Sequence, residues 1–291
     1  MTTNNTTTPS VVITGASTGI GEACALHLDQ LGWRVFAGVR RDADGEALQR
    51  KASPRLMPLR IEVTDAASIA AARDIVAHEL GDRGLDGLVN NAGIAIAAPL
   101  EFIPIDDLRR QLEINVIGQI AVTQAFLAPI RHARGRVVNI GSISGKMATP
   151  FVGPYAASKF AMEALTDALR CELRPWGIQV AIVEPGSIAT PIWEKSTAEA
   201  DRMEAQLPPE GHTLYGAAIK ALRAFAEITA GRGIPPIEVA KAVTHALTAK
   251  KPKTRYIVGR DARLQAVVAS VVPDRIRDGL IERQLKLPRK A

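Results

Sequence analysis

The glycine-rich segment at residues 14–21, TGASTGIG, constrains the fold more than any other part of the chain. It follows a short β-branched run, Val11–Ile13, and precedes Glu22–Leu31, where apolar residues recur with helical periodicity. A strand, a glycine turn and a helix in this order bring free backbone N–H groups and the positive end of a helix dipole to one point. A purely structural turn could use the same glycines, but the two flanking elements favour a site for phosphate groups.

Short apolar runs alternate with helical patterns along most of the chain. Strands are predicted at Val11–Ile13, Arg34–Val39, Leu56–Val63, Leu85–Val89, Arg136–Ile140, Ile178–Glu184 and, last, Arg255–Val258. Helices are predicted at residues 66–78, Asp106–Ile130, Tyr155–Leu173 and Ile237–Leu247. No repeat or interdomain linker interrupts the series, so residues 10–291 are expected to form one domain. The alternation predicts an α/β protein with a doubly wound parallel sheet and a site at the carboxyl ends of its strands.

The second predicted strand ends in Arg40-Arg41, which bears on the choice of nucleotide. In folds that bind dinucleotides, an acidic residue near this point holds the adenosine ribose, whereas an arginine suits a 2′-phosphate. The first acid here is Asp42, beyond both arginines. Because a guanidinium offers paired donors to phosphate, the sequence favours NADP(H) over NAD(H), although two solvated surface arginines would give the same pattern.

Tyr155 and Lys159 are four residues apart in a predicted helix, so their side chains are expected on the same face. An ammonium beside a phenol favours the phenolate and would lower the phenol pKa. Ser142 follows the fifth predicted strand and could hold the reacting oxygen. Asn115 lies inside an apolar helix, where it would either satisfy a buried backbone group or position a catalytic water. A Tyr-x-x-x-Lys pattern alone is also found on solvated helices, so its chemistry requires a hydride carrier nearby.

Residues 192–235 break the alternation, since prolines and glycines separate helical pieces that carry Trp193, Tyr215 and Phe225. A long insertion after the last site strand is typical of a substrate lid, and its apolar side chains predict an apolar pocket. The same side chains could instead pack the insertion onto the body of the protein. Residues 260–291 form a basic extension that could pack on its own or a second subunit, cover the pocket or contact anionic lipid; packing on protein is favoured. Residues 1–9 are expected to be a disordered tail.

Composition argues against several classes of function. Residues 250–291 carry 12 Lys/Arg and 4 Asp/Glu, a net of +8 in a chain whose total is +6, so no basic body surface for nucleic acid is expected. Cys24 and Cys171 are far apart and the histidines are scattered, which predicts neither a disulfide nor a metal site. The longest uncharged run, Ile114–Ile130, contains amides and a proline and is expected to be a buried helix. No signal peptide is recognisable, so a soluble, cytoplasmic protein is expected.

Taken in order, these motifs resemble those of the single-domain short-chain dehydrogenases/reductases, which have a Rossmann-like sheet. The motifs that match in order and spacing cover about residues 10–191: Thr14-Gly15-x-x-x-Gly19-Ile20-Gly21, Asn90-Asn91-Ala92-Gly93, Asn115, Ser142, Tyr155-x-x-x-Lys159 and Pro185-Gly186 with Thr190. Residues 245–249 and 254–256 look similar to the branch of retinol and hydroxysteroid dehydrogenases. Two features depart from that branch: no N-terminal membrane anchor is recognisable, and Glu62 stands where an Asp is usual.

The resemblance implies a role for each matching residue. Tyr155 would be the general acid in reduction and the base in oxidation, Lys159 would lower its pKa and hold the nicotinamide ribose, and Ser142 would orient the substrate oxygen. Asn115 would position a water in a proton relay. The implied cofactor contacts are Gly15, Ser17, Gly19, Ile20 and Gly21 at the pyrophosphate, Arg40, Arg41, Glu62, Val63, Asn91, Ala92 and Gly93 on the adenosine side, and Pro185, Gly186, Ile188 and Thr190 at the nicotinamide. No metal would be needed, because Ser142 and Tyr155 donate to the developing alkoxide.

The residues and the resemblance together predict an NADP(H)-dependent oxidoreductase that interconverts an alcohol and a ketone or aldehyde on an apolar, steroid-, retinoid- or lipid-like substrate. A sensor or scaffold that binds NADP(H) without catalysis is the alternative, although Ser142, Tyr155 and Lys159 are all retained. The family favours a homodimer or homotetramer built through the long helices. Membrane contact through the basic extension is the less favoured expectation.

Overall fold

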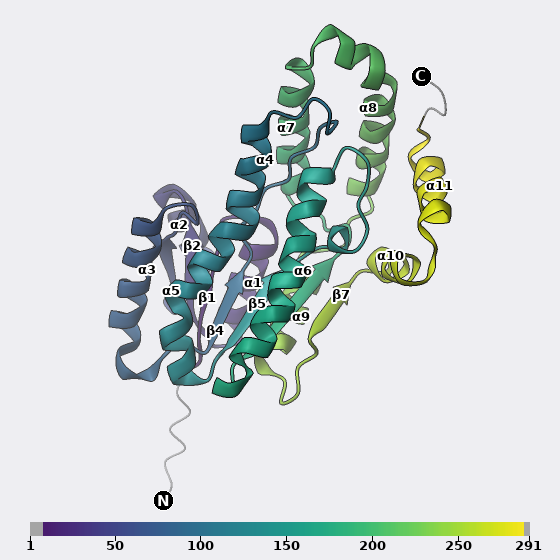
Figure 1. The fold of residues 1–291 in the computed structure, drawn as a ribbon. Coiled ribbons are helices and arrows are strands. Elements are labelled where there is room, and N and C mark those ends of the chain that lie inside the picture. The colour runs from purple at the N-terminus through teal and green to yellow at the C-terminus, as the bar shows by residue number, and fades with distance from the viewer. Residues whose placement is uncertain (1–7, 288–291) are drawn as a thin grey trace, which may run out of the picture.

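The computed structural model describes residues 8–287, and its centre is a sheet of seven parallel strands (Figure 1). Their order across the sheet is β3-β2-β1-β4-β5-β6-β7. The strands are β1 (Ser10–Ile13), β2 (Arg34–Val39), β3 (Leu56–Arg60), β4 (Gly87–Asn90), β5 (Arg136–Ile140), β6 (Gln179–Pro185) and β7 (Arg255–Val258). Central strands are buried on both faces, which is why their sequences are nearly continuous apolar runs. Most of the predicted tail, residues 1–7, lies outside the described residues.

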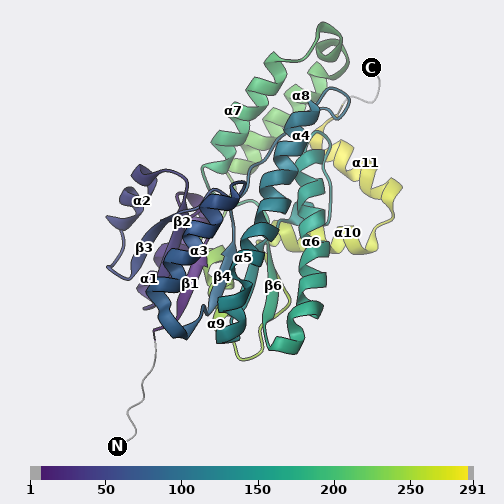
Figure 2. The same ribbon diagram turned by 60° about the vertical axis from the view of Figure 1, so that its left-hand side comes forward.

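Helices cover both faces of this sheet (Figure 2). They are α1 (Gly19–Gln30), α2 (Asp42–Gln49), α3 (Ala66–Leu80), α4 (Ile105–Leu112), α5 (Gly118–Ala133), α6 (Gly153–Leu173), α7 (Ile192–Ala205), α8 (Pro209–Ala230), α9 (Ile237–Thr248), α10 (Arg260–Val271) and α11 (Asp274–Leu285). One core joins the sheet to α1 and α9 through side chains such as Leu28 and Val243. The other joins it to α3 and α5 through Val76 and Phe126. Two cores on opposite faces confirm the prediction of a doubly wound α/β fold.

The strand order reverses next to β1, and this reversal decides where a ligand can bind. Val11 of β1 lies opposite Val35 of β2 on one side and opposite Gly87 of β4 on the other. In open α/β sheets, ligands bind at the carboxyl ends of the strands on either side of such a reversal. The glycine segment follows β1, and Asn91 follows β4, so both lie at this position.

The predicted helix over 106–130 is interrupted, which is the main difference from the expected elements. A π-helical turn, η2 (Glu113–Ile117), joins α4 to α5, and Asn115 lies within it. Such turns insert a residue into the helical ladder and are frequent at functional positions. The short helix α2 was not predicted, because its mostly polar sequence buries only Gly45 and Leu48.

Helices α7 and α8 form an antiparallel pair that extends beyond the carboxyl edge of the sheet (Figure 1). They make up most of the segment 192–235 that was predicted to be a lid. Helices α10 and α11 follow β7, and α11 lies beside α8 in both views (Figures 1 and 2). Three short 3-10 turns complete the described elements: η1 (Gly81–Arg83), η3 (Ile143–Gly145) and η4 (Arg174–Trp176).

Candidate active site

The glycine segment between β1 and α1 has the backbone geometry that a phosphate group requires. Gly15 and Gly19 both have φ of +64°, a conformation that side chains disfavour. A Cβ on Gly21 would lie 2.2 Å from the Gly15 carbonyl oxygen, so the close approach of two backbone segments excludes a side chain there. In the part of the chain described, Thr18 at the N-cap of α1 makes no capping bond from its side chain. The first N–H groups of the helix therefore remain available to an anion.

Side chains at the end of β4 hold this segment in place. The Asn91 amide donates from Nδ2 to the carbonyl oxygens of Thr14 and Gly15, both at 3.0 Å. The Thr14 hydroxyl accepts the N–H groups of Asn91 and Ala92 at 2.9 and 3.0 Å. Asn91 was predicted to contact adenosine, and the structure shows that its amide supports the glycine segment. Ala92 and Gly93 continue the chain directly behind it.

A cavity of about 420 Å³ lies beside the carboxyl ends of β2 and β3. Its walls are formed by Arg40, Glu62, Thr64, Arg109, Arg110, Glu113 and Ile114. Arg41 instead donates two hydrogen bonds of 2.8 and 2.9 Å to the Asp44 carboxylate. In the structure of residues 8–287 it does not contribute to the wall of this cavity. Of the two predicted arginines, Arg40 is therefore the one that lines this cavity in the part of the chain described.

Other predicted contacts lie around these two features. Ser17 and Ile20 lie within the glycine segment and are both partly exposed, with Ile20 packed against the core. Val63 is only 4% exposed and packs closely against Gly118 at the start of α5. Val63 therefore shapes the sheet edge near the cavity rather than offering a polar contact.

Ser142, Tyr155 and Lys159 come together at the carboxyl end of β5. Ser142 begins the η3 turn and accepts the Ser144 N–H at 3.1 Å, and its hydroxyl interacts with the phenol of Tyr155. Tyr155 and Lys159 lie on the first two turns of α6. The Lys159 Nζ is 5.6 Å from the centre of the Tyr155 ring and donates to the Ile140 carbonyl oxygen at 2.8 Å. A serine hydroxyl, a phenol and an ammonium thus share one small region.

Burial shifts the pKa of two of these groups. Desolvation raises the pKa of the Tyr155 phenol, and its interaction with the Ser142 hydroxyl offsets part of that rise. Burial lowers the pKa of the Lys159 ammonium to about 8. In this structure the Lys159 ammonium is directed to the Ile140 carbonyl oxygen, and desolvation is the larger influence on the Tyr155 pKa, so a lowering of that pKa by Lys159 stays a prediction.

Asn115 uses its side chain to hold the neighbouring loop. Its Oδ1 accepts the Ile94 N–H at 2.9 Å, and its Nδ2 donates to the Ile94 carbonyl oxygen at 2.9 Å and to the Ser158 hydroxyl at 3.1 Å. Both amide hydrogens are therefore used by the protein. Asn115 was predicted either to satisfy a buried backbone group or to position a catalytic water. The structure shows the first of these, because the Asn115 side chain binds both backbone groups of Ile94.

After β6 the chain turns back toward the glycine segment. Pro185 ends the strand, and the Gly186 N–H donates to the Val258 carbonyl oxygen at 2.9 Å. Ile188 is 4% exposed, and its carbonyl oxygen accepts the Trp193 indole N–H at 2.8 Å. These bonds fix the segment that was predicted to meet the nicotinamide.

Two side chains connect this segment to the start of α1. A Cβ on Gly19 would lie 3.1 Å from the Cβ of Thr190, so the two segments are in close contact. Lys195 of α7 donates to the Thr18 hydroxyl at 3.3 Å, next to the predicted phosphate site. The sequence analysis did not identify Lys195, because a single lysine in a polar helical stretch resembles many surface lysines.

Helices α7 and α8 approach the body of the protein through charged and apolar contacts. Arg202 of α7 lies 2.8 Å from Asp107 of α4. Tyr215 of α8 packs edge-on against Phe102 and Phe151, with ring centres 5.9 Å apart in each pair. Beneath these helices is a small cavity of about 40 Å³ whose lining includes Ala98, Phe151, Met203, Leu207 and Leu222. Glu204 and Arg223 also line this cavity, whose other walls are apolar and include Phe151 just before α6.

Comparison with known proteins places the chain among one family of enzymes. The sequence profile described as "short chain dehydrogenase" matches residues 9–201. The chain is 40% identical over 287 residues to retinol dehydrogenase 5 of Homo sapiens, covering 97% of this chain and 90% of that protein. It is 37% identical over 289 residues to 17-beta-hydroxysteroid dehydrogenase type 6 of Bos taurus, with the same two coverages, 97% and 90%.

A solved structure gives the same result at the level of the fold. A short chain dehydrogenase from Burkholderia cenocepacia J2315, in complex with NADP, superposes with a TM-score of 0.72 at 25% sequence identity. The match covers 97% of this chain and 98% of that one.

The predicted cytoplasmic location is wrong. The retinol and 17-beta-hydroxysteroid dehydrogenases that the chain resembles are membrane-associated. Within residues 8–287, one helical stretch, Ile105–Ala133, is also long and apolar enough to cross a membrane, with a mean hydropathy of 1.2 over its most apolar 18 residues. The same stretch supplies Val122, Phe126 and Ile130 to the core, so one face of it is buried against the sheet.

Proposed function

Because the chain belongs to the short-chain dehydrogenase family and is an oxidoreductase that interconverts alcohols and carbonyl compounds, we propose that it uses NADP(H) and Tyr155 to do so on an apolar substrate. The observation that carries this proposal is the meeting of Ser142, Tyr155 and Lys159 at the carboxyl end of β5. The glycine segment lies at the carboxyl end of β1 in the same sheet. A nucleotide bound along that edge can face the phenol.

The choice of NADP(H) rests on Arg40. This side chain lines the cavity at the ends of β2 and β3, where a fold of this type receives the adenosine half of the nucleotide. Its guanidinium can donate two hydrogen bonds to a 2′-phosphate. The solved relative that contains NADP supports the same choice. The glycine segment fits the pyrophosphate, and Lys195 is close enough to α1 to add a positive charge there.

The bound nicotinamide supplies or accepts a hydride, and the protein manages the accompanying proton. In reduction, Ser142 and Tyr155 donate hydrogen bonds to the substrate carbonyl oxygen, where negative charge develops. The Tyr155 hydroxyl then gives its proton to that oxygen, and in oxidation the phenolate removes it. Lys159 stabilises the phenolate by its positive charge, and its lowered pKa of about 8 allows it to exchange protons near neutral pH.

The substrate is an apolar alcohol or carbonyl compound of retinoid, steroid or long-chain lipid type. Apolar side chains of α7 and α8, such as Met203 and Leu222, line a small cavity together with Phe151, which lies four residues before Tyr155. The two named relatives are a retinol and a hydroxysteroid dehydrogenase. Residues 192–235 act as a lid on this pocket within a single domain. We also expect a homodimer or homotetramer, for which the exposed apolar residues Ile105 and Ile117 on the α4–α5 side are available. Sedimentation equilibrium would test the oligomeric state.

The test is a turnover assay with NADPH or NADP⁺ against retinoids, steroids, long-chain aldehydes and small ketones. Tyr155→Phe removes only the hydroxyl and should lower kcat roughly 10²–10⁴-fold, while NADPH binding stays within about twofold. Unchanged turnover in this variant would exclude Tyr155 as the acid and base. Turnover with none of these compounds, together with tight NADPH binding, would point to a non-catalytic nucleotide-binding protein.

A further inference from the structure

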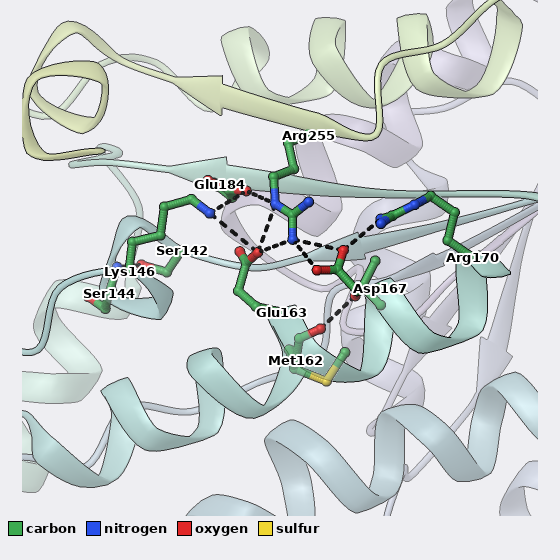
Figure 3. Close-up of polar contacts among 10 residues, drawn as sticks. Ser142, Ser144, Lys146, Met162, Glu163, Asp167, Arg170, Glu184 and Arg255 are labelled. Carbon is green, nitrogen blue, oxygen red and sulfur yellow. Dashed lines mark hydrogen bonds and ion pairs between the residues drawn. The ribbon is translucent and has the colours of Figure 1, made fainter. Parts of the chain in front are cut away.

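Six charged side chains form a cluster next to the turn that carries Ser142 (Figure 3). They are Lys146, Glu163, Asp167, Arg170, Glu184 and Arg255. They come from four segments: the end of the η3 turn, helix α6, strand β6 and strand β7. Three of these segments also carry residues of the proposed active site. The chemistry described above uses none of the six, so their arrangement calls for its own explanation.

Lys146 connects the Ser142 turn to the rest of the cluster. It directly follows η3, and its Nζ lies 3.3 Å from Glu184 Oε1 and 3.4 Å from Glu163 Oε2. The turn between Ser142 and Lys146 is tight, since the Gly145 N–H donates to the Ser142 carbonyl oxygen at 2.9 Å. A displacement of Lys146 is therefore transmitted to Ser142 over only four residues.

The same turn is pressed against the catalytic helix. A Cβ on Gly145 would lie 2.9 Å from the Lys159 carbonyl oxygen and 3.2 Å from Glu163 Cγ. Glu163 is one helical turn beyond Lys159 and two beyond Tyr155. The contact of Lys146 with Glu163 and Glu184 thus sets how the Ser142 turn sits between α6 and β6.

Glu184 is the least compensated member of the cluster. It is 0% exposed, it directly precedes Pro185, and neither of its carboxylate oxygens has a hydrogen bond of ordinary geometry within residues 8–287. Among the described residues, its charge is met only by Lys146 at 3.3 Å and Arg255 at 3.4 Å. Burial, with added repulsion from Glu163, raises the pKa of Glu184 to about 7, and Lys146 offsets part of this rise.

The other groups around Glu184 are already committed to partners. Arg255 places Nη2 2.8 and 2.7 Å from the two Asp167 oxygens and Nε 3.1 Å from Glu163 Oε2. Arg170 reaches Asp167 at 2.7 Å and lies at the outer end of the cluster.

Two charged groups on neighbouring elements complete these surroundings. Lys159 is directed to Ile140, and Asp261 of α10 accepts the Ser187 N–H at 2.8 Å. Within residues 8–287, no further ion pair reaches Lys146 or Glu184.

We propose that Lys146 is a positioning residue for the reaction at Ser142 and Tyr155, held in place by ionised Glu184 and loosened when Glu184 is protonated. This inference rests on the proposed oxidoreductase function. With Glu184 ionised, Lys146 is attracted to both α6 and β6, and the Ser142 turn is fixed between them. With Glu184 neutral, the contact with Glu163 is the one ion pair left in the described part of the chain for the Lys146 side chain, which is 24% exposed. Small displacements of a group that holds the reacting oxygen are costly to the rate.

The first experiment removes the charge of Lys146 and measures kcat and NADPH affinity separately. Lys146→Met should lower kcat roughly tenfold with the NADPH dissociation constant within about twofold, because the turn holds the substrate oxygen and not the nucleotide. Lys146→Arg restores the charge and should recover most of the rate. Arg170→Met is the matched control, since it removes a cation from the outer end of the cluster, and it should leave kcat unchanged. Thermal unfolding of each variant identifies any that fail to fold.

The second experiment tests the role of Glu184 by dividing the kcat of Glu184→Gln by that of the wild type at each pH. This ratio cancels the titration of Tyr155 and Lys159, which both proteins share. It should be near one at about pH 5.5 and fall severalfold by about pH 8.5, because only the wild type gains the charge as pH rises through 7. A ratio that is constant across this range, or Lys146→Met with wild-type kcat, overturns the proposal.

A third readout does not depend on turnover. Amide hydrogen exchange of residues 143–147, corrected for its intrinsic pH dependence, should slow between about pH 6 and 8 in the wild type and not in Glu184→Gln. If no alcohol or carbonyl compound is converted, the proposed function fails while this measurement still decides whether Glu184 controls the turn. Equal protection in both proteins at every pH refutes that control.

Discussion

Around the glycine segment the backbone is held by uncharged groups, whereas behind Ser142 and Tyr155 it is held by ions. On the nucleotide side, the Thr14 hydroxyl accepts the Asn91 backbone N–H at 2.9 Å, and the Asn91 side-chain amide donates to the Thr14 carbonyl oxygen at 3.0 Å. On the catalytic side, Lys146 and Glu184 face each other at 3.3 Å in a buried position. Neutral hydrogen bonds do not titrate near pH 7, but a buried carboxylate does. The nucleotide side should therefore keep one geometry over the range in which the catalytic side changes.

A neutral network also joins the two sides. Asn90 donates to the Thr123 hydroxyl at 2.8 Å and to Asn139 at 2.9 Å, and Asn139 donates to the Thr166 hydroxyl of α6 at 2.8 Å. These groups are fully buried, and each bond leaves fewer polar atoms unpaired. Uncharged groups thus help to fix α6 against the sheet, in addition to the ion pairs that Arg255 of β7 makes with Glu163 and Asp167.

The largest expected effect breaks the nucleotide side alone. Gly21→Ala places a Cβ 2.2 Å from the Gly15 carbonyl oxygen and 2.5 Å from Asn91 Nδ2, so the backbone of the glycine segment must move. We expect a loss of NADPH affinity of more than about 100-fold and a decrease of about 1–3 kcal/mol in the free energy of unfolding. Fluorescence titration with NADPH and urea denaturation measure the two effects.

Gly279→Ala in α11 is the matched control for this substitution, because no atom of residues 8–287 outside its own helix lies within 4 Å of the added Cβ. It should leave NADPH affinity unchanged and stabilise the helix by up to about 1 kcal/mol. If Gly21→Ala binds NADPH as the wild type does, the glycine segment does not hold the pyrophosphate.

A smaller effect separates the two arginines at the edge of the nucleotide side. Arg40→Leu should weaken NADPH binding roughly 10–100-fold and leave NADH binding nearly unchanged, since only NADPH carries the 2′-phosphate. Arg41→Leu should have little effect on either nucleotide, because Arg41 binds Asp44 instead of lining the cavity. Equal losses for both nucleotides in Arg40→Leu would remove the basis for the NADP(H) assignment.

The smallest effect concerns stability on the catalytic side. The pKa of Glu184 is about 7 in the folded protein and 4.5 without its surroundings, so the folded state binds the proton more tightly. Its contribution to stability is present below about pH 4.5 and is lost as pH rises toward 7. The wild type loses this contribution as pH rises, whereas Glu184→Gln has no group that titrates at this position. The free energy of unfolding of Glu184→Gln minus that of the wild type should therefore increase by roughly 1–3 kcal/mol between pH 5 and pH 8.

Urea denaturation of both proteins at the two pH values measures this difference. A difference that stays constant, or changes in the opposite direction, contradicts a raised Glu184 pKa. The expected result means that ionised Glu184 costs stability while it fixes the Ser142 turn. Such an exchange of stability for geometry is common at functional sites.

Local patterns were enough to predict most of the fold and several features of the site. The strand before Gly15 and the helix after Gly21 identified the phosphate segment, because backbone close to a ligand requires glycine whatever the rest of the chain does. The spacing of Tyr155 and Lys159 placed both on one helical face for the same local reason. The interruption of the helix at Asn115 was missed, since neighbouring residues give no sign of the bonds that the Asn115 side chain makes to the distant Ile94.

The sequence by itself determined the seven-stranded α/β fold, the glycine segment and which side chains could carry the chemistry. These features follow from the periodicity of buried residues and from backbone geometry, both of which are written into neighbouring positions. Only the tertiary structure decided that Arg40 and not Arg41 lines the cavity, and that Lys146, Glu184 and Arg255 meet behind Ser142. The pKa of Tyr155 and of Glu184 was decided there as well. Charge interactions and desolvation depend on distances through space, which exist only after β6, β7 and α6 have packed together.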